Sequence, residues 1–157
     1  MKRLILYIIY VILLSPVTLS QTTFLDIPIT GTKEEMINKL KSKGFQEKEC
    51  WMEGFYEDNE CLLILVTEND TVVQLDLINK RWNDNIKAKM IFTRLYYGLQ
   101  SNIYYKEISF AEKNKMYEAV FYQVNSNGIA NKNNVLKIKM MHGNGNKYTI
   151  GLFFYNK

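Results

Sequence analysis

Residues 60–79 read ECLLILVTENDTVVQLDLIN and contain two apolar segments on either side of a polar turn. In the second segment Val73, Leu75 and Leu77 alternate with other residues, which is the period of a β-strand with one buried face. The first segment is apolar at consecutive positions, which is typical of a strand buried on both faces near the centre of a sheet. The stretch therefore predicts an antiparallel pair of strands at Glu60–Thr67 and Thr71–Asn79.

A helix is expected before this pair. Thr32 can cap it, and Glu35 can reach back to the cap amide, which is the capping-box arrangement. Gly44 can take the left-handed position that ends a helix, and Phe45 can supply the apolar contact that accompanies it. The buried stripe of this helix is expected to be Met36, Ile37 and Leu40.

A second helix is expected from about Asp84 to Gln100, with Ile86, Met90, Ile91, Leu95 and Leu99 at helical spacing. The fold class predicted is α+β, an antiparallel sheet with two helices packed on it in the order helix, three strands, helix, four strands. The first helix follows an extended lead-in over 21–30. The five further strands are expected at Lys48–Tyr56, Tyr105–Ala111, Met116–Val124, Val135–Met141 and Lys147–Tyr155. Lys137 and Lys139 predict a solvated face or a protected edge.

The first twenty residues have the form of a secretory signal peptide. Lys2 and Arg3 precede an apolar run that is too short for the ~20 residues of a spanning helix, and small residues lead to a cleavage point before Gln21. We therefore expect a signal peptide at 1–20, a single α+β domain at 21–157, and a periplasmic or secreted location. No stable membrane insertion is expected after cleavage.

The charged residues of both signs are spread along the chain and form no basic cluster in the sequence. Without Lys2 and Arg3 the chain has 18 basic and 16 acidic residues, spread along its length, so nucleic acid is not an expected partner. Lysine, asparagine, isoleucine and tyrosine are abundant, as AT-rich codons favour. Asn69-Asp70-Thr71 is a short sequon, and Thr71 at a turn is sterically open to glycosylation.

Two cysteines remain in the exported chain. If a hairpin turn places Phe55 opposite Cys61, Cys50 lies about five residues further along its strand. At ~3.3 Å per residue the offset is roughly 16 Å, whereas a disulfide requires Cα atoms within ~7 Å. Two buried, unpaired thiols are therefore expected.

Several strings resemble a family of small exported proteins of unknown function from Gram-negative anaerobes. The resemblance brings no catalytic residue. The predicted layout is also similar to that of β-lactamase-inhibitor-like and PepSY-like proteins, and this similarity of topology implies a protein-binding role. The strings are residues 24–32, 43–45, 53–55 and 117–123.

No catalytic, metal or cofactor site is predicted. His142 is the single histidine and lies beside a glycine-rich loop, so an exposed loop histidine is expected. A secreted hydrolase of glycans or the cell wall remains the alternative, with Glu53, Asp76 or Glu118 as its carboxylates. Core packing is expected to explain Trp51 and Phe55, and a contact between sheet and helix to explain Trp82.

The favoured function is a non-enzymatic exported domain that binds a protein or glycan of the cell envelope. Tyrosine pairs bracket the end of the second expected helix, where not all four rings can be buried. Exposed tyrosine suits protein and glycan contact, because its large apolar ring ends in a hydrated hydroxyl. The candidate binding residues are Tyr96, Tyr97, Tyr104 and Tyr105.

Overall fold

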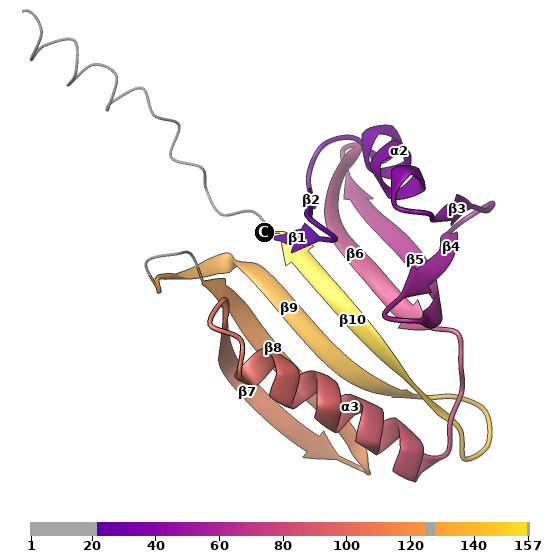
Figure 1. Ribbon diagram of the computed structural model, residues 1–157, viewed down its shortest axis with the longest axis vertical. Helices are drawn as coiled ribbons and strands as arrows, with labels where there is room; N and C mark the ends of the chain where they lie inside the picture. Colours follow the sequence, from indigo (N-terminus) through magenta and orange to yellow (C-terminus); the bar gives the residue numbers. More distant parts are fainter. Residues whose placement is uncertain (1–21, 125–127, 157) are drawn as a thin grey trace, which may run out of the picture.

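The computed structural model describes residues 22–124 and 128–156, and its framework is an eight-stranded antiparallel sheet (Figure 1). The strands lie across the sheet in the order β3-β4-β5-β6-β10-β9-β8-β7, and a separate two-stranded hairpin, β1–β2, precedes the first described helix. In chain order the elements are β1 (Thr23–Phe24), β2 (Ile27–Pro28), α2 (Lys33–Ser42), β3 (Gln46–Glu47), β4 (Met52–Tyr56), β5 (Asn59–Glu68), β6 (Thr71–Asn79), α3 (Asn85–Gln100), β7 (Tyr105–Lys113), β8 (Met116–Val124), β9 (Ala130–His142) and β10 (Tyr148–Asn156).

The sheet consists of two units with the same element order. In each unit one helix is followed by four strands that pair in sequence, α2 with β3–β6 and α3 with β7–β10. The last strands of the two units, β6 and β10, pair with each other from Ile78 with Gly151 to Gln74 with Tyr155. The expected α+β class and antiparallel sheet are confirmed, and the β6–β10 pair joins the two units into one sheet.

The predicted strand count of the first unit is wrong, because four strands follow its helix. Residues 48–51 reverse the chain, with the amide of Lys48 donating to the carbonyl of Trp51 at 2.8 Å. The reversal divides the strand that was expected over Lys48–Tyr56, and Gln46–Glu47 pairs beside β4 as the edge strand β3. The strand of residues 62–66 is interior, but the central pair is β6–β10.

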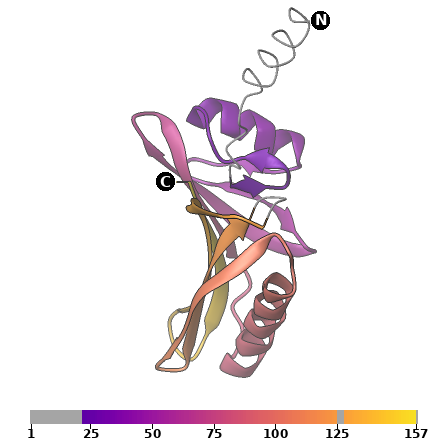
Figure 2. The same ribbon diagram turned by 90° about the vertical axis from the view of Figure 1, so that its left-hand side faces the viewer.

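Both helices cover the same face of the sheet. Ile37 of α2 lies near Leu63, and Leu95 of α3 lies near Leu77 and Leu152, which occupy one row across β5, β6 and β10 with Leu63. We call the opposite side the open face, because no described helix covers it (Figure 2). One row of the open face consists of Ile64, Asp76, Phe153, Lys137 and Val120.

The ends of α2 follow the sequence closely. Thr32 is the N-cap, and its hydroxyl and the Glu35 carboxylate form the predicted capping box. At the other end Gly44 has φ of +92°, and the amide of Phe45 donates to the carbonyl of Leu40. Phe45 is buried as expected, so the local signals alone define this helix.

The second helix begins as predicted, and Ile91, Leu95 and Leu99 of its expected stripe pack against the core, but the other two residues of the stripe do not. Asp84 is the N-cap, and its carboxylate accepts from the amide of Lys87 at 2.8 Å. Ala88 and Phe92 are buried against the sheet, whereas Ile86 and Met90 are 74% and 67% exposed. Small Ala88 permits close approach to the sheet, and apolar side chains occur on both sides of this helix, so spacing alone did not select the buried one.

The β4–β5 hairpin has a shorter turn than expected. Glu57 and Asp58 both have positive φ, which gives a two-residue turn, and Tyr56 pairs with Asn59. The register therefore moves by one residue, and Cys61 lies opposite Gly54 instead of Phe55. Because side chains alternate along a strand, the shift places Cys61 on the helix-covered face and Phe55 on the open face.

The lead-in expected over 21–30 forms a hairpin that packs into the core, with residue 21 outside the described residues. The ring of Phe24 lies 6.0 Å from Phe45, 5.4 Å from Tyr56 and 5.4 Å from Phe154. Its contacts come from both units, so the β1–β2 hairpin helps to bridge them. The side-chain amide of Asn156 donates to the carbonyl of Ile29 at 3.0 Å, which fastens the end of β10 to this hairpin.

Gly54 and Gly98 form a matched pair for testing this packing. A Cβ at Gly54 would lie 2.6–2.9 Å from three ring atoms of Phe45, whereas a Cβ at Gly98 meets nothing within 4 Å. We expect Gly54→Ala to lower the free energy of unfolding by about 1–3 kcal/mol and Gly98→Ala to raise it by about 0.5–1 kcal/mol. Urea unfolding measures both, and equal effects of the two substitutions would contradict the assigned contact.

Candidate functional site

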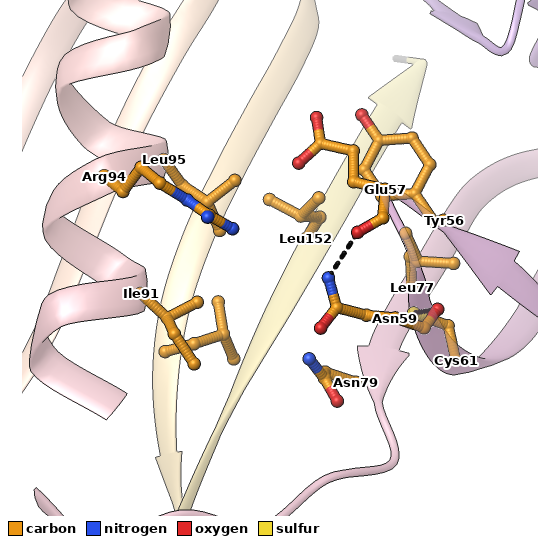
Figure 3. Close-up of a pocket in the computed structure, with 11 residues that line it drawn as sticks. Tyr56, Glu57, Asn59, Cys61, Leu77, Asn79, Ile91, Arg94, Leu95 and Leu152 are labelled. Carbon is orange, nitrogen blue, oxygen red and sulfur yellow. Dashed lines mark hydrogen bonds between the residues drawn. The ribbon is translucent and has the colours of Figure 1, made fainter. Parts of the chain in front are cut away.

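A groove lies on the helix-covered face, between α3 and the β4–β5 turn (Figure 3). Its floor is apolar and comes from the strands around the junction of the two units. Its main part has a volume of about 490 Å³, and a smaller hollow of about 40 Å³ continues toward Ile91. A volume of this size is typical of sites for small ligands. Leu77, Leu136, Ile150, Leu152 and Phe154 form the floor, and Ile91, Leu95 and Leu99 form the α3 wall.

Charged groups of opposite sign stand on the two walls of the groove. Arg94 extends from α3, and Glu57 lies on the β4–β5 turn, with Leu152 of the floor between them in the view of Figure 3. The Glu57 carbonyl accepts from the side-chain amide of Asn59 at 2.6 Å, which fixes the turn. The groove therefore offers an apolar floor with one cation and one anion at its rim.

Two tyrosine hydroxyls add polar groups to the groove. Burial, followed by the charge of Glu57, raises the pKa of Tyr56 to about 12. Burial also raises the pKa of Tyr105, and Tyr105 is itself among the groups that raise the pKa of Tyr56. Both hydroxyls are therefore protonated near neutral pH and can donate hydrogen bonds.

The two cysteines differ in environment, although both are unpaired as predicted. Cys61 is buried at the inner end of the groove, where burial raises its thiol pKa to about 11. Cys50 is exposed in the reversal before β4, so the prediction that it is buried is wrong. The thiol of Cys61 remains protonated near neutral pH, which makes it a poor nucleophile.

The four tyrosines proposed for binding differ in their exposure, although the rings of Tyr96 and Tyr97 lie 5.2 Å apart. Tyr96 is half-buried, and its hydroxyl donates to the carboxylate of Glu107 at 2.8 Å, so it ties α3 to β7. Tyr105 is half-buried and lines the groove. Tyr97 and Tyr104 are 60% and 53% exposed.

The three carboxylates considered for hydrolysis share the open face but do not meet. Glu53 and Glu118 lie in one row of the sheet with four strands between them, which corresponds to about 24 Å at the usual strand spacing. Asp76 lies on β6, which is two strand positions from β4 with Glu53 and three from β8 with Glu118. At the usual strand spacing, both distances measured across the sheet exceed about 9 Å. Paired glycosidase carboxylates stand about 5–9.5 Å apart.

Each of these carboxylates also has a local partner. Glu53 accepts from the indole nitrogen of Trp51 at 3.0 Å, and this bond and Lys80 lower the pKa of Glu53. Burial raises the pKa of Asp76, whose carboxylate accepts from Gln74 at 2.6 Å. Glu118 lies 3.5 Å from Lys137 and 3.8 Å from Lys139. The lysines of β9 therefore belong to a solvated face in the sheet interior, and the alternative of a protected edge is wrong.

Three other expectations concern aromatic and histidine side chains. Trp51 and Phe55 are 40% and 70% exposed, so core packing does not explain them. Phe55 lies on the open face, and Trp51 lies in the chain reversal before β4. Trp82 comes shortly before α3 in the chain and lies against Gly143. Its contact is therefore with the loop that joins β9 and β10. His142 is exposed at the end of β9, where its ring lies 4.9 Å from that of Tyr148.

Most groove residues were missed by sequence reasoning. Tyr56 and Glu57 meet Arg94 and Leu95 only because β6 pairs with β10, and that pairing has no local signal in the sequence. Arg94 offered a partial signal, because it is one of only three arginines in a lysine-rich chain and lies within an apolar helix. Its planar, multiply donating side chain distinguishes it from the lysines that predominate in the chain.

Comparison with protein-family models, curated proteins and solved structures gave no match. The resemblance to small exported proteins therefore stays a prediction. Neither of the two described helices has the length and apolar character needed to cross a bilayer. Within residues 22–124 and 128–156, no three histidine, cysteine, aspartate or glutamate side chains are grouped as metal ligands.

Thiol labelling tests the environments of the two cysteines. We expect iodoacetamide to modify Cys50 in the folded protein and Cys61 only after denaturation, because Cys61 is buried and its pKa is raised to about 11. Mass spectrometry should show one added group before unfolding and two after it. A denatured, unreduced sample without any added group would mean that the cysteines are bridged.

Alkaline unfolding tests the burial of Tyr56. Its pKa is about 12 in the folded chain and about 10 as the ordinary value, so the unfolded chain releases this proton first as pH rises. The resulting stabilisation is complete below about pH 10 and is lost as pH approaches 12. We expect Tyr56→Phe to show a smaller fall in unfolding free energy between about pH 9 and pH 11 than the wild type. Tyr97→Phe, which alters an exposed tyrosine, serves as the control and should show the same fall as the wild type. If the fall for Tyr56→Phe is as steep as for these two proteins, the assigned burial of Tyr56 is contradicted.

Proposed function

We propose that the chain is an exported, non-enzymatic domain that binds an extended segment of a partner protein in the groove. Export is inferred from the leader-like sequence of residues 1–20, which lie outside the described residues. The observation that carries the binding proposal is the groove itself, an apolar floor between two walls with polar groups at its rim. Concave apolar sites with a few convergent polar groups are the usual form of binding sites.

The length of the groove supports a short peptide segment as its occupant. The α3 wall extends from Ile91 to Leu99, which is about 12 Å at the helical rise of ~1.5 Å per residue. An extended chain advances ~3.3 Å per residue. The groove therefore accommodates about four residues of an extended segment, and the rest of the partner would lie outside it.

The chemistry of the walls supports a peptide over a glycan. Leu152, Phe154 and Leu136 at the floor suit apolar side chains, which a glycan lacks. The hydroxyl of Tyr105 and the amide of Asn102 can bond to peptide groups. Arg94 and Glu57 can each pair with a charged group of the segment, and such pairing adds orientation more than affinity.

Among the four tyrosines first considered, this proposal keeps Tyr105 as a groove residue. Tyr96 supports the groove indirectly, because its bond to Glu107 holds α3 beside β7. Tyr97 and Tyr104 are exposed outside the groove lining and are not assigned to this binding site.

Selection from a random heptapeptide phage library tests the proposal. Leu95→Trp places an indole in the groove, whereas Val66→Trp adds the same group on the open face, where Val66 is 37% exposed. We expect peptides selected on the wild type to bind Leu95→Trp at least about tenfold more weakly, because a filled groove excludes their apolar side chains. Val66→Trp should bind them as the wild type does.

Two outcomes contradict the proposal. One is enrichment of no peptide on a wild-type protein that shows cooperative unfolding. The other is equal affinity of the selected peptides for wild type and Leu95→Trp, provided that both variants retain the wild-type melting temperature.

A further inference from the structure

The side of α3 that faces away from the sheet carries an exposed apolar stripe. We define the outer stripe as Ile86, Met90, Thr93 and Tyr97, and the exposed fractions of Ile86, Met90 and Tyr97 are 74%, 67% and 60%. The spacing of four, three and four residues places all four within an arc of about 60° on a helix of 3.6 residues per turn. The packing of α3 on the sheet does not account for this stripe, because Ala88 and Phe92 supply that contact.

Exposed apolar side chains continue beyond both ends of α3. Trp82, before the helix, is 48% exposed, and Ile103 and Tyr104, after it, are 80% and 53% exposed. Half of the large apolar side chains exposed on the described chain therefore lie on α3 or next to its ends. Such a concentration is more than the scattered exposure that is normal for a surface, and it indicates an interaction site.

The charges around the outer stripe are basic. The helix contains Lys87, Lys89 and Arg94 and no acidic residue. Lys87 and Lys89 flank the outer stripe on its two sides at helical spacing. Lys89 also lies 4.9 Å above the ring of Tyr117, and Arg94 belongs to the groove side.

The carboxylates of β7 beside α3 have partners of their own. Glu107 accepts from the hydroxyl of Tyr96, and Glu112 accepts from the hydroxyl of Tyr117, each at 2.8 Å. None of the ion pairs among the described residues involves a cation of α3. Lys89 leans toward β7 and β8, where a hydrogen bond with Tyr117 and the charge of Glu112 raise its pKa. Lys87 forms none of the ion pairs of the described residues, and its charge is open to an external anion.

We propose that the outer stripe is a docking surface for an anionic lipid bilayer, on which α3 lies in the plane of the headgroups. A narrow, convex apolar stripe fits acyl chains, which conform to its shape, while Lys87 on one side reaches the phosphates and Lys89 adds positive charge on the other. Trp82 and Tyr104, which flank α3 in the chain, are of the kind that favours the headgroup level. This surface is separate from the groove, so a peptide and a bilayer could bind at the same time.

Vesicle binding with Trp82 as the reporter tests this proposal. The chain has two tryptophans, and Trp51→Phe leaves Trp82 as the only one; residues 21–157 contain every described element and lack the apolar leader. We expect Trp82 emission to move to shorter wavelength with vesicles of phosphatidylglycerol and phosphatidylethanolamine. No shift is expected with phosphatidylcholine vesicles, and added salt should weaken the binding, because the attraction depends on opposite charge.

Matched variants separate the outer stripe from apolar surface in general. In the Trp51→Phe background, Ile86→Ser with Met90→Ser should weaken partition to the anionic vesicles by about tenfold or more. Phe55→Ser removes a side chain that is 70% exposed on the open face and should leave partition unchanged. All three substituted side chains are largely exposed, so the melting temperature should be retained and is measured as a check.

The proposal is overturned if the wild type binds neither kind of vesicle, if the stripe variant binds as well as the wild type, or if Phe55→Ser causes the same loss. Cross-linking of the outer stripe to an acidic protein, without vesicle binding, would also overturn it and assign the surface to that protein. Peptide selection on the groove is independent of these outcomes, so failure of one proposal is distinguishable from failure of the other.

Discussion

The pairing of β6 with β10 is the constraint on which the rest of the structure depends. Each unit supplies one helix and four strands, and only this pair connects their strands in one sheet. Antiparallel pairing at the centre sets Leu77 opposite Leu152 and Leu75 opposite Phe154, so the apolar rows of both units form one continuous surface. The β1–β2 hairpin adds a second bridge through Phe24, whose ring meets Phe45 and Phe154. Without the β6–β10 pair, each unit would expose an apolar strand edge to water.

The candidate sites follow from this arrangement. Because both helices lie on one face, the helix-covered surface above the junction is bounded by α3 and the β4–β5 turn, and the groove forms there with Arg94 and Glu57 on its walls. The same packing turns Ala88 and Phe92 inward and leaves Ile86 and Met90 on the outside of α3. The open face contains the carboxylates of Glu53, Asp76 and Glu118, each too far from the others for the paired chemistry of a glycosidase. These three carboxylates are therefore not placed to act as a pair.

Local signals in the sequence were sufficient for the helix ends and for most strands. Thr32 with Glu35, and Gly44 with Phe45, defined α2 because their interactions lie within a few residues. The errors arose where tertiary contact decides. The two-residue turn at Glu57–Asp58 moved the hairpin register, and the reversal after Glu47 created an extra strand. The buried side of α3 was ambiguous because apolar residues occur on both of its sides. The groove could not be predicted, since its walls meet only through the pairing of two strands that are 70 or more residues apart in the chain.

Native-state hydrogen exchange on β6 and β10 tests the central role of their pairing most directly. If the junction holds both units in one cooperative structure, the slowest amides of β6 and of β10 will exchange with the same free energy, equal to that of global unfolding measured with urea. In each unit, the amides of β4–β5 and of β8–β9 that exchange only by global unfolding should show the same free energy of exchange. Two distinct plateau values, one for α2 with β3–β6 and one for α3 with β7–β10, would show that the units unfold independently and would contradict this account.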